Sequence, residues 1–237
     1  MIFAAGLGTR LLNETAEKPK ALVEVGNKTL LQLAIEKLVN SGVNEIVVNV
    51  HHFSEQVKNF ISEHDFEVPV LISDESDKLL DTGGGLKKAG VFLKGKSPIL
   101  IYNVDIISDI NLSKVINDHY VSGALATVVV RDRETQRYLK FNDDKKLVGW
   151  INKKTDEIKI SAPENFEKSV EMAFSGIHII NPEIFDYMPD EERFSIIDLY
   201  LELAKTQLIR GYFDNSKVWI DVGKPDQLQK ARQLFSD

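Results

Sequence analysis

The sequence predicts an α/β protein with a mixed, mostly parallel sheet flanked by helices. Over the first 105 residues, strand-like apolar runs alternate with segments of helical periodicity. The strand-like runs are apolar throughout, as parallel strands covered on both faces should be. No Gly/Ser linker, internal repeat or low-complexity segment interrupts the chain, which favours one compact domain over residues 1–237.

The N-terminal half supplies the alternating elements. The opening apolar run MIFAA ends in Gly6 and Gly8, which indicates a buried strand that breaks into a glycine loop. Apolar residues at helical spacing predict a helix over 30–39, ended by Asn40-Ser41-Gly42. The further predicted elements are a strand over 45–50, a helix from an N-cap at Ser54 to about Ile61, a strand over 68–72, a glycine turn leading into a short helix over 81–93, and a strand over 97–105.

After Asp105 the pattern changes. A strand is expected over 124–130, and residues 136–152 are typical of a hairpin with Asn142-Asp143-Asp144 at its tip. An irregular polar stretch over 153–168 and a strand over 170–180 follow. The last third predicts a helix near 196–208, strands over 208–213 and 218–221, and a final helix opened by Pro225.

Composition excludes several kinds of site. The 237 residues contain no Cys, so disulfides, thiolate zinc sites and cysteine nucleophiles are excluded. The five His residues form no spaced metal cluster, and any catalytic metal must therefore be held by carboxylates (His51, His52, His64, His119, His178). The formal charge of −7 argues against nucleic-acid and anionic-membrane partners, which need a basic face. With no membrane-length apolar run and no basic leader, we expect a soluble, cytoplasmic chain.

The loop after the first strand is the strongest candidate site. It runs A-A-G-L-G-T-R-L over 4–11 and is followed by K-P-K over 18–20. A dinucleotide-binding fingerprint would need glycine where Leu11 stands, and the Gly-Lys-Ser/Thr of a P-loop is absent. What remains is a loop whose small residues bring backbone N–H groups close to an anion. Arg10 would be a bidentate phosphate donor and Lys20 a mobile point charge, with Pro19 fixing the segment before Lys20.

These residues give the chain a family resemblance. The segment G-L-G-T-R-L followed by K-P-K-A-L-V resembles the signature of the sugar-1-phosphate nucleotidyltransferases. Four later segments agree with it in order: LLDTGGGLKKA (79–89) resembles the nucleobase-binding turn, IYNVD (101–105) the strand ending in the metal aspartate, FSGIHII (174–180) the sugar-binding strand, and WIDVGKPDQL (219–228) the second metal aspartate. The resemblance spans essentially the whole chain.

The resemblance implies a fold and a reaction. The fold would be the Rossmann-like, GT-A-like nucleotide-diphospho-sugar transferase fold, with a nucleotide-binding part over about 1–110 and a sugar-binding part over about 111–237. The partners would be a nucleoside triphosphate and a sugar 1-phosphate. Within the family the chain looks most like N-acetylmuramate-1-phosphate uridylyltransferases, with mannose-1-phosphate guanylyltransferases as the alternative. A nucleotide-sugar-binding regulatory protein that has lost turnover is the alternative from another class.

The resemblance also assigns site residues. Arg10 and Lys20 would be catalytic, Arg10 on the departing β- and γ-phosphates and Lys20 on the α-phosphate. Asp105 and Asp221 would hold Mg²⁺. The nucleotide would contact Ala5, Gly6, Gly8, Thr9, Gly83, Gly84, Gly85 and Asn103, and the sugar would contact Arg137, Ser175 and Gly176.

Two segments depart from the family pattern. Val104 stands before Asp105 where the family strand usually ends in Gly-Asp, and W-I-N-K-K over 150–154 stands where many relatives have an aromatic residue and V-E-K-P. The segment 131–154 carries eight basic and four acidic residues. Our hypothesis is that Arg137 or a neighbour binds an extra anion on the sugar, such as the lactyl carboxylate of N-acetylmuramate. The alternative is a solvated basic hairpin. No repeat or heptad supplies an assembly signal.

Overall fold

The computed structural model describes residues 1–95 and 97–235 and confirms the predicted fold class, α/β with a mixed, mostly parallel sheet flanked by helices. The chain forms two compact units, and each is built from separate stretches of sequence. Unit 1 comprises 1–80, 102–112 and 216–237, and unit 2 comprises 81–101 and 113–215. The predicted division at about residue 110 concerns what each part binds, and it stays a prediction.

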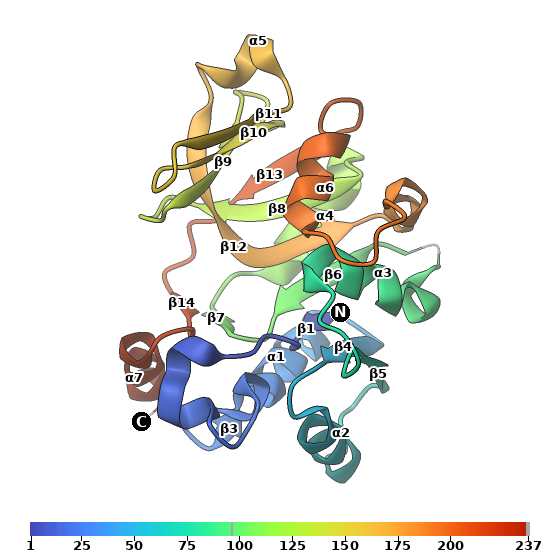
Figure 1. Ribbon diagram of the computed structural model, residues 1–237, viewed down its shortest axis with the longest axis vertical. Helices are drawn as coiled ribbons and strands as arrows, with labels where there is room; N and C mark the ends of the chain where they lie inside the picture. Colours follow the sequence, from blue (N-terminus) through green and yellow to red (C-terminus); the bar gives the residue numbers. More distant parts are fainter. Residues whose placement is uncertain (96, 236–237) are drawn as a thin grey trace. The chain divides into compact units, whose positions relative to one another are not determined.

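Unit 1 is organised around a parallel sheet (Figure 1). Strand β1 (Ile2–Phe3) pairs with β4 (Ile46–Val50) on one side and with the end of β6 (Ile99–Asn103) on the other, and β4 pairs with β5 (Val70–Asp74). All five residues of β4 are buried, as expected for a strand covered on both faces. The carboxyl ends of β1, β4, β5 and β6 therefore lie along one edge, where open α/β sheets bind ligands.

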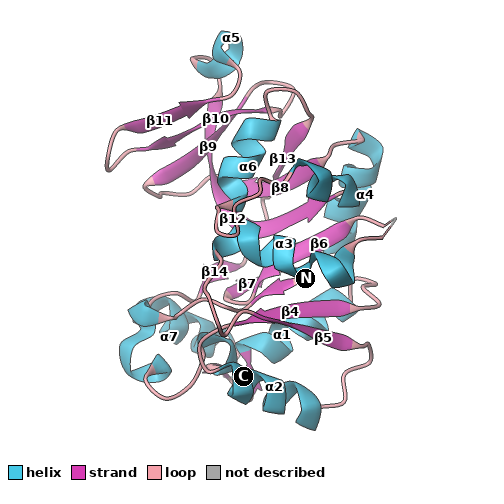
Figure 2. Ribbon diagram, turned by 45° about the vertical axis from the view of Figure 1, so that its right-hand side comes forward, coloured by secondary structure: helices cyan, strands magenta, loops and turns pink. Residues whose placement is uncertain are grey.

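Helices cover this sheet (Figure 2). Helix α1 (Leu30–Val39) matches its predicted range and buries five apolar residues, and the Thr29 hydroxyl accepts a hydrogen bond from the Gln32 N–H at 3.1 Å. Helix α2 (Ser54–Glu63) packs against β5, and α7 (Pro225–Leu234) begins at the predicted proline.

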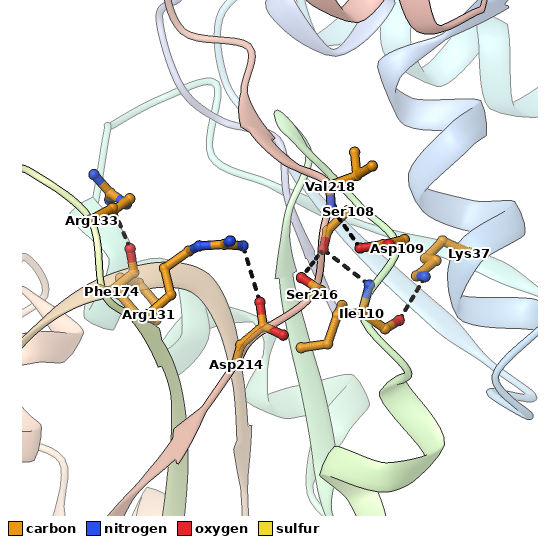
Figure 3. Close-up of polar contacts among 10 residues, drawn as sticks. All are labelled: Lys37, Ser108, Asp109, Ile110, Arg131, Arg133, Phe174, Asp214, Ser216 and Val218. Atoms are coloured by element: carbon orange, nitrogen blue, oxygen red, sulfur yellow. Dashed lines mark hydrogen bonds and ion pairs between the residues drawn. The ribbon is translucent and has the colours of Figure 1, made fainter.

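Two small ladders and two 3₁₀ helices complete unit 1. Strands β7 (Ile106–Ser108) and β14 (Trp219–Asp221) pair antiparallel, as do β2 (Glu24–Val25) and β3 (Lys28–Thr29). The β7–β14 ladder continues at its end, where Asp109 Oδ1 accepts the Val218 N–H at 2.9 Å (Figure 3). The 3₁₀ helices are η1 (Thr9–Thr15) and η2 (Lys20–Leu22).

Unit 2 contains a mixed sheet in the order β11-β10-β9-β12-β8-β13. The ladders are antiparallel except for β8 with β13. Its strands are β8 (Ala126–Arg131), β9 (Arg137–Phe141), β10 (Leu147–Asn152), β11 (Glu157–Ile160), β12 (Val170–Ile180) and β13 (Ile209–Phe213). Its helices are α3 (Asp81–Leu93), α4 (Leu112–Ser122), α5 (Pro163–Phe166), η3 (Pro182–Tyr187) and α6 (Ile196–Leu203).

Several local expectations were wrong or incomplete. Ser54 is the first residue of α2 rather than its N-cap, because Phe53 takes the N-cap position in a left-handed conformation with φ 54°. The stretch 153–168, expected to be irregular, contains β11 and α5. Helix α4 was not predicted. Within the described ranges, no helix is long and apolar enough to cross a membrane.

The first prediction concerns the ion pair between η1 and α7. Arg232 donates to both carboxylate oxygens of Glu14, at 2.9 and 3.1 Å. Replacing Arg232 by Ala should lower the free energy of unfolding at pH 7 by about 0.5–1 kcal/mol, the upper range for solvent-accessible ion pairs. Urea denaturation measures the loss, and Lys230→Ala, an exposed cation on the same helix, should cost less.

The same pair predicts a pH dependence. The hydrogen bond from Arg232 is the main cause that lowers the pKa of Glu14 from its ordinary 4.5. The pair's contribution is therefore fully present above pH 4.5 and is lost as the pH falls through the lower, folded-state pKa. The difference between wild type and Arg232→Ala should shrink in that acid range. An undiminished difference would contradict an electrostatic origin.

Candidate active site

The glycine loop after β1 forms a tight turn against Lys20. Gly8 has φ 66°, and its carbonyl accepts hydrogen bonds from the Leu11 N–H at 2.9 Å and the Thr15 hydroxyl at 3.0 Å. A Cβ on Gly8 would lie 3.0 Å from Thr15 Cγ2 and 3.1 Å from Lys20 Cβ. Both the positive φ and this close approach favour glycine. The predicted loop and the predicted lysine are therefore in contact.

Lys20 is buried and forms an ion pair with Asp105. Pro19, with φ −68° and ψ 151°, is the extended residue that precedes η2 and delivers Lys20 to this place. The side chains of Lys20 and Asp105 are only 8% and 20% exposed, and the Lys20 ammonium donates directly to Asp105 Oδ2. An ammonium this deeply buried needs such a partner.

Asp105 lies in the turn between β6 and β7 rather than on a strand. The Tyr102 hydroxyl donates to the Ile106 carbonyl at 2.8 Å and closes this turn. Burial, and secondarily the charge of Asp105, raise the pKa of Tyr102, so the phenol keeps its proton and remains a donor. The Asp105 carbonyl accepts the Val222 N–H at 2.8 Å, which joins this turn to the end of β14.

Asp221 and Arg10 both lie close to Gly223, just after β14. Asp221 is the last residue of β14 and pairs with Ile106, so it is next to Asp105 across the ladder. A Cβ on Gly223 would lie 2.7 Å from Arg10 Nη2 and 2.7 Å from Asp221 Oδ1. Gly223 thus leaves the space that the guanidinium and the carboxylate share. Unit 1 brings together all four residues expected to handle phosphate or metal: Arg10, Lys20, Asp105 and Asp221.

This donor set is compatible with a hard divalent cation. Asp105 and Asp221 offer carboxylate oxygens from adjacent backbone positions, and Mg²⁺ typically takes one or two carboxylates and completes its shell with water and substrate phosphate. In the described residues, no group of three or more His, Cys, Asp or Glu could hold a metal by itself. The residues therefore fit a Mg²⁺ that is shared with a phosphate ligand.

The remaining nucleotide-side residues of unit 1 lie at the same sheet edge. Asn103 is the last residue of β6 and pairs with Phe3 of β1, directly before the glycine loop. Ala5 is buried, whereas Gly6 and Thr9 are exposed at the loop surface. The structure brings these positions together, and their contact with nucleotide stays a prediction.

The triple glycine of unit 2 is helical. Gly83, Gly84 and Gly85 lie in the first turns of α3, so the predicted glycine turn is wrong. The N–H groups of Gly83 and Gly84 donate to the Phe194 carbonyl at 2.9 and 3.3 Å, and a Cβ on Gly83 would lie 2.3 Å from the Phe194 ring. Close packing against Phe194 thus explains Gly83 without a ligand. Nucleobase contacts from these glycines stay a prediction.

The predicted sugar strand is distorted at its motif. The β8–β12 register shifts between Phe174 and His178, and Gly176 within this interval has φ 77°. Ser175 is fully buried. Arg133 donates to the Phe174 carbonyl at 3.0 Å (Figure 3). Arg133 therefore contacts β12 where the register shift begins. The sequence motif alone did not indicate this contact.

Most cations of the basic segment 131–154 have partners inside unit 2. Arg131 pairs with Asp214 at 3.1 Å, and Lys153 pairs with Glu171 at 2.5 Å. Lys140 and Lys145 lie over the rings of Phe166 and Phe213. Arg137 is exposed at the start of β9, and within the described residues its side chain has no ion pair. Arg137 is therefore available to an anion from solution.

The chain is similar in sequence to a known family and to characterised proteins. The model of the family described as "Nucleotidyl transferase" matches residues 1–237. The chain is 32% identical to N-acetylmuramate alpha-1-phosphate uridylyltransferase of Caulobacter vibrioides, with 100% of this chain and 96% of that protein covered.

Longer relatives match as well. Mannose-1-phosphate guanyltransferase of Debaryomyces hansenii is 29% identical, with 99% of this chain and 64% of that protein covered. The chain therefore spans less than two thirds of that relative. Among solved structures, HddC from Yersinia pseudotuberculosis complexed with GMP-PN aligns with a TM-score of 0.78 at 21% identity, covering 99% of this chain and 97% of that one.

The second prediction concerns the Lys20–Asp105 pair. Asp105→Asn and Lys20→Met should each destabilise the protein, and the double variant should lose less than the sum. The expected coupling energy is about 1–3 kcal/mol, because each single change leaves a charged or polar group without its buried partner. Urea unfolding of the four proteins in EDTA measures it. A coupling below about 0.5 kcal/mol, the usual error of additivity, would show that the contact contributes nothing to stability.

Proposed function

The chain belongs to the nucleotidyl transferase family, and from this premise we propose that it transfers a nucleotidyl group from a nucleoside triphosphate to a sugar 1-phosphate. The products are a nucleoside diphosphate sugar and pyrophosphate. One observation carries the proposal: two cations, Arg10 and Lys20, and two carboxylates, Asp105 and Asp221, lie together in unit 1 beside the glycine loop.

The chemistry explains why this set suffices. A phosphate oxygen of the sugar 1-phosphate attacks the α-phosphorus of the triphosphate, and the bond to the β-phosphate bridging oxygen breaks. The electron pair leaves with pyrophosphate. The attacking oxygen is already anionic, so no general base is needed. The protein must align two polyanions and neutralise the charge between them.

The cations have distinct tasks in this scheme. Arg10, which is exposed at the loop surface, would bind the departing β- and γ-phosphates through its planar guanidinium. Lys20 would contact the α-phosphate. Because its ammonium is paired with Asp105 in the free protein, it must exchange part of this contact for phosphate when the nucleotide binds.

The carboxylates would hold the metal. The family is generally dependent on a divalent metal, and we propose Mg²⁺ on Asp105 and Asp221. When bound, the ion would neutralise phosphate charge. Gly223 supports this arrangement, since any side chain at that position would enter the space next to Asp221 Oδ1 and Arg10 Nη2.

For the substrates, we propose UTP and N-acetylmuramate 1-phosphate. The uridylyltransferase from Caulobacter vibrioides supports this choice because it matches over nearly its whole length. GTP with mannose 1-phosphate is the second candidate. The mannose-1-phosphate guanyltransferases, and the HddC structure complexed with GMP-PN, favour it. A nucleotide-sugar-binding protein without turnover is disfavoured by the presence of Arg10, Lys20, Asp105 and Asp221 together.

The third prediction tests the reaction. Pyrophosphate release should be seen with one nucleotide among ATP, CTP, GTP and UTP, and with one of several sugar 1-phosphates. Asp105→Asn should lower kcat by at least about a hundredfold, as expected when a group that organises transition-state charge is lost. Asp109→Asn is the matched control, because Asp109 caps the β7–β14 ladder outside the cluster. No release with any pair would favour the binding protein instead.

The fourth prediction tests the sugar. If Arg137 binds the lactyl carboxylate, Arg137→Ala should lower the preference for N-acetylmuramate 1-phosphate over N-acetylglucosamine 1-phosphate. About a tenfold fall in the ratio of kcat/KM values corresponds to one charge-assisted hydrogen bond. Lys154→Ala, which removes an exposed cation from the same segment, should leave the ratio unchanged. An unchanged ratio in Arg137→Ala would exclude this role.

A further inference from the structure

Glu75 is a carboxylic acid that the proposed chemistry does not use. It follows β5, and its side chain is fully buried in unit 1. Burying a carboxyl group is costly unless hydrogen bonds compensate for the lost water. An apolar side chain would fill the same space without that cost. The hydrogen bonds of the carboxyl group must therefore account for a glutamate at this position.

Glu75 reaches the glycine loop through one intervening side chain. Glu75 Oε1 accepts a hydrogen bond from Asn49 Nδ2 at 2.7 Å. Asn49 Oδ1 in turn accepts the backbone N–H of Ala4 at 2.8 Å. Asn49 is 3% exposed and Ala4 6% exposed, so both contacts are shielded from water. These two hydrogen bonds connect the end of β5 to the first residue after β1.

The contact on Ala4 lies where the backbone ladder stops. In the β1–β4 pairing, Ile2 is opposite Val48 and Phe3 is opposite Asn49. Ala4 is the next residue, and from there the chain leaves the sheet to form the loop. The Asn49 side chain thus supplies the acceptor for the first N–H beyond the ladder.

Glu75 is itself held by backbone contacts. Its N–H donates to the Val50 carbonyl at 2.7 Å, and its carbonyl accepts the Lys78 N–H at 3.0 Å. The same carbonyl contacts His51 Nδ1 at 2.6 Å. Because the Glu75 backbone is tied to the residue after Asn49, the carboxyl group has a fixed position relative to the amide that it contacts.

We propose that Asn49 and Glu75 are positioning residues that fix the glycine loop for nucleotide binding. An amide side chain can present either its oxygen or its NH₂ group to a neighbour. Facing the Glu75 acceptor, Asn49 must direct its NH₂ group toward the carboxyl oxygen. Its carbonyl oxygen then faces the Ala4 N–H, as the loop requires. The proposal rests on the proposed function for the identity of the ligand, but not for the contacts.

In the wild type, position 49 donates and position 75 accepts, so exchanging these two roles tests the connection. In Asn49→Asp, two acceptors meet between positions 49 and 75, and the hydrogen bond is lost. In the double variant Asn49→Asp/Glu75→Gln, one oxygen of the new carboxylate accepts the Ala4 N–H and the other accepts from the new amide. The connection is then restored with the donor and acceptor reversed. Glu75→Gln alone keeps an amide oxygen that can accept from Asn49.

Two measurements separate positioning from general stability. Calorimetry with UTP and GTP, using whichever binds wild type more tightly, should show affinity about tenfold weaker in Asn49→Asp and within about threefold of wild type in the double variant. The ¹H–¹⁵N resonances of Gly6 and Gly8 should shift in Asn49→Asp and return in the double variant. Binding of the sugar 1-phosphate should not change.

A substitution that creates a cavity beside β4 provides the matched control. Val47 is 1% exposed on the same strand, and Val47→Ala should lower the melting temperature without changing the nucleotide affinity or the two glycine resonances. The positioning role is wrong if the double variant loses as much nucleotide affinity as the two single variants together. It is also wrong if Val47→Ala weakens nucleotide binding as much as Asn49→Asp does. If wild type binds neither nucleotide, the proposed function fails, and the glycine resonances alone decide whether the pair positions the loop.

Discussion

A buried ammonium must be paired, and in this protein that requirement joins two parts of the cluster formed by Arg10, Lys20, Asp105 and Asp221. Lys20 is delivered by Pro19 beside the glycine loop, and Asp105 is delivered by the turn after β6. Their contact holds segments together that are 85 residues apart in the sequence. Gly8 lies so close to Lys20 that a Cβ on it would be 3.1 Å from Lys20 Cβ. The loop, the cation and the acidic turn are therefore mutually dependent parts of one arrangement.

The charges around the candidate site differ from the net charge of the whole chain. The chain carries a formal charge of −7, which disfavours phosphate ligands at long range. Within unit 1, Lys20 is paired with Asp105, and Arg10 and Asp221 both lie close to Gly223, so two positive and two negative side chains balance within the cluster. Under the proposed function, a polyanionic ligand would compete with Asp105 for Lys20, and a divalent ion would bind the carboxylates. Binding of the proposed ligand would then be an exchange of ionic partners.

The sequence predicted well what depends on periodicity and poorly what depends on packing. The ranges of α1 and β12 were predicted correctly because their apolar spacing is set by the residues themselves. Gly83 was expected in a turn, yet it lies in α3, and the close approach of the Phe194 ring explains why this helical position is a glycine. Likewise Gly223 and Asn49 gave no signal, since their importance comes from neighbours distant in sequence.

The interleaved construction of unit 1 has a consequence for synthesis on the ribosome. The first 80 residues carry the glycine loop, Lys20 and three strands of the sheet, but Asp105 comes from the stretch 102–112 and Asp221 from 216–237. Asp105 can therefore reach Lys20 once about half of the chain has been made, whereas Asp221 joins the glycine loop only when the chain is almost complete. Contacts of such high sequence separation fold slowly. Premature chain termination before residue 216 would leave unit 1 without Asp221 and β14, and therefore incomplete.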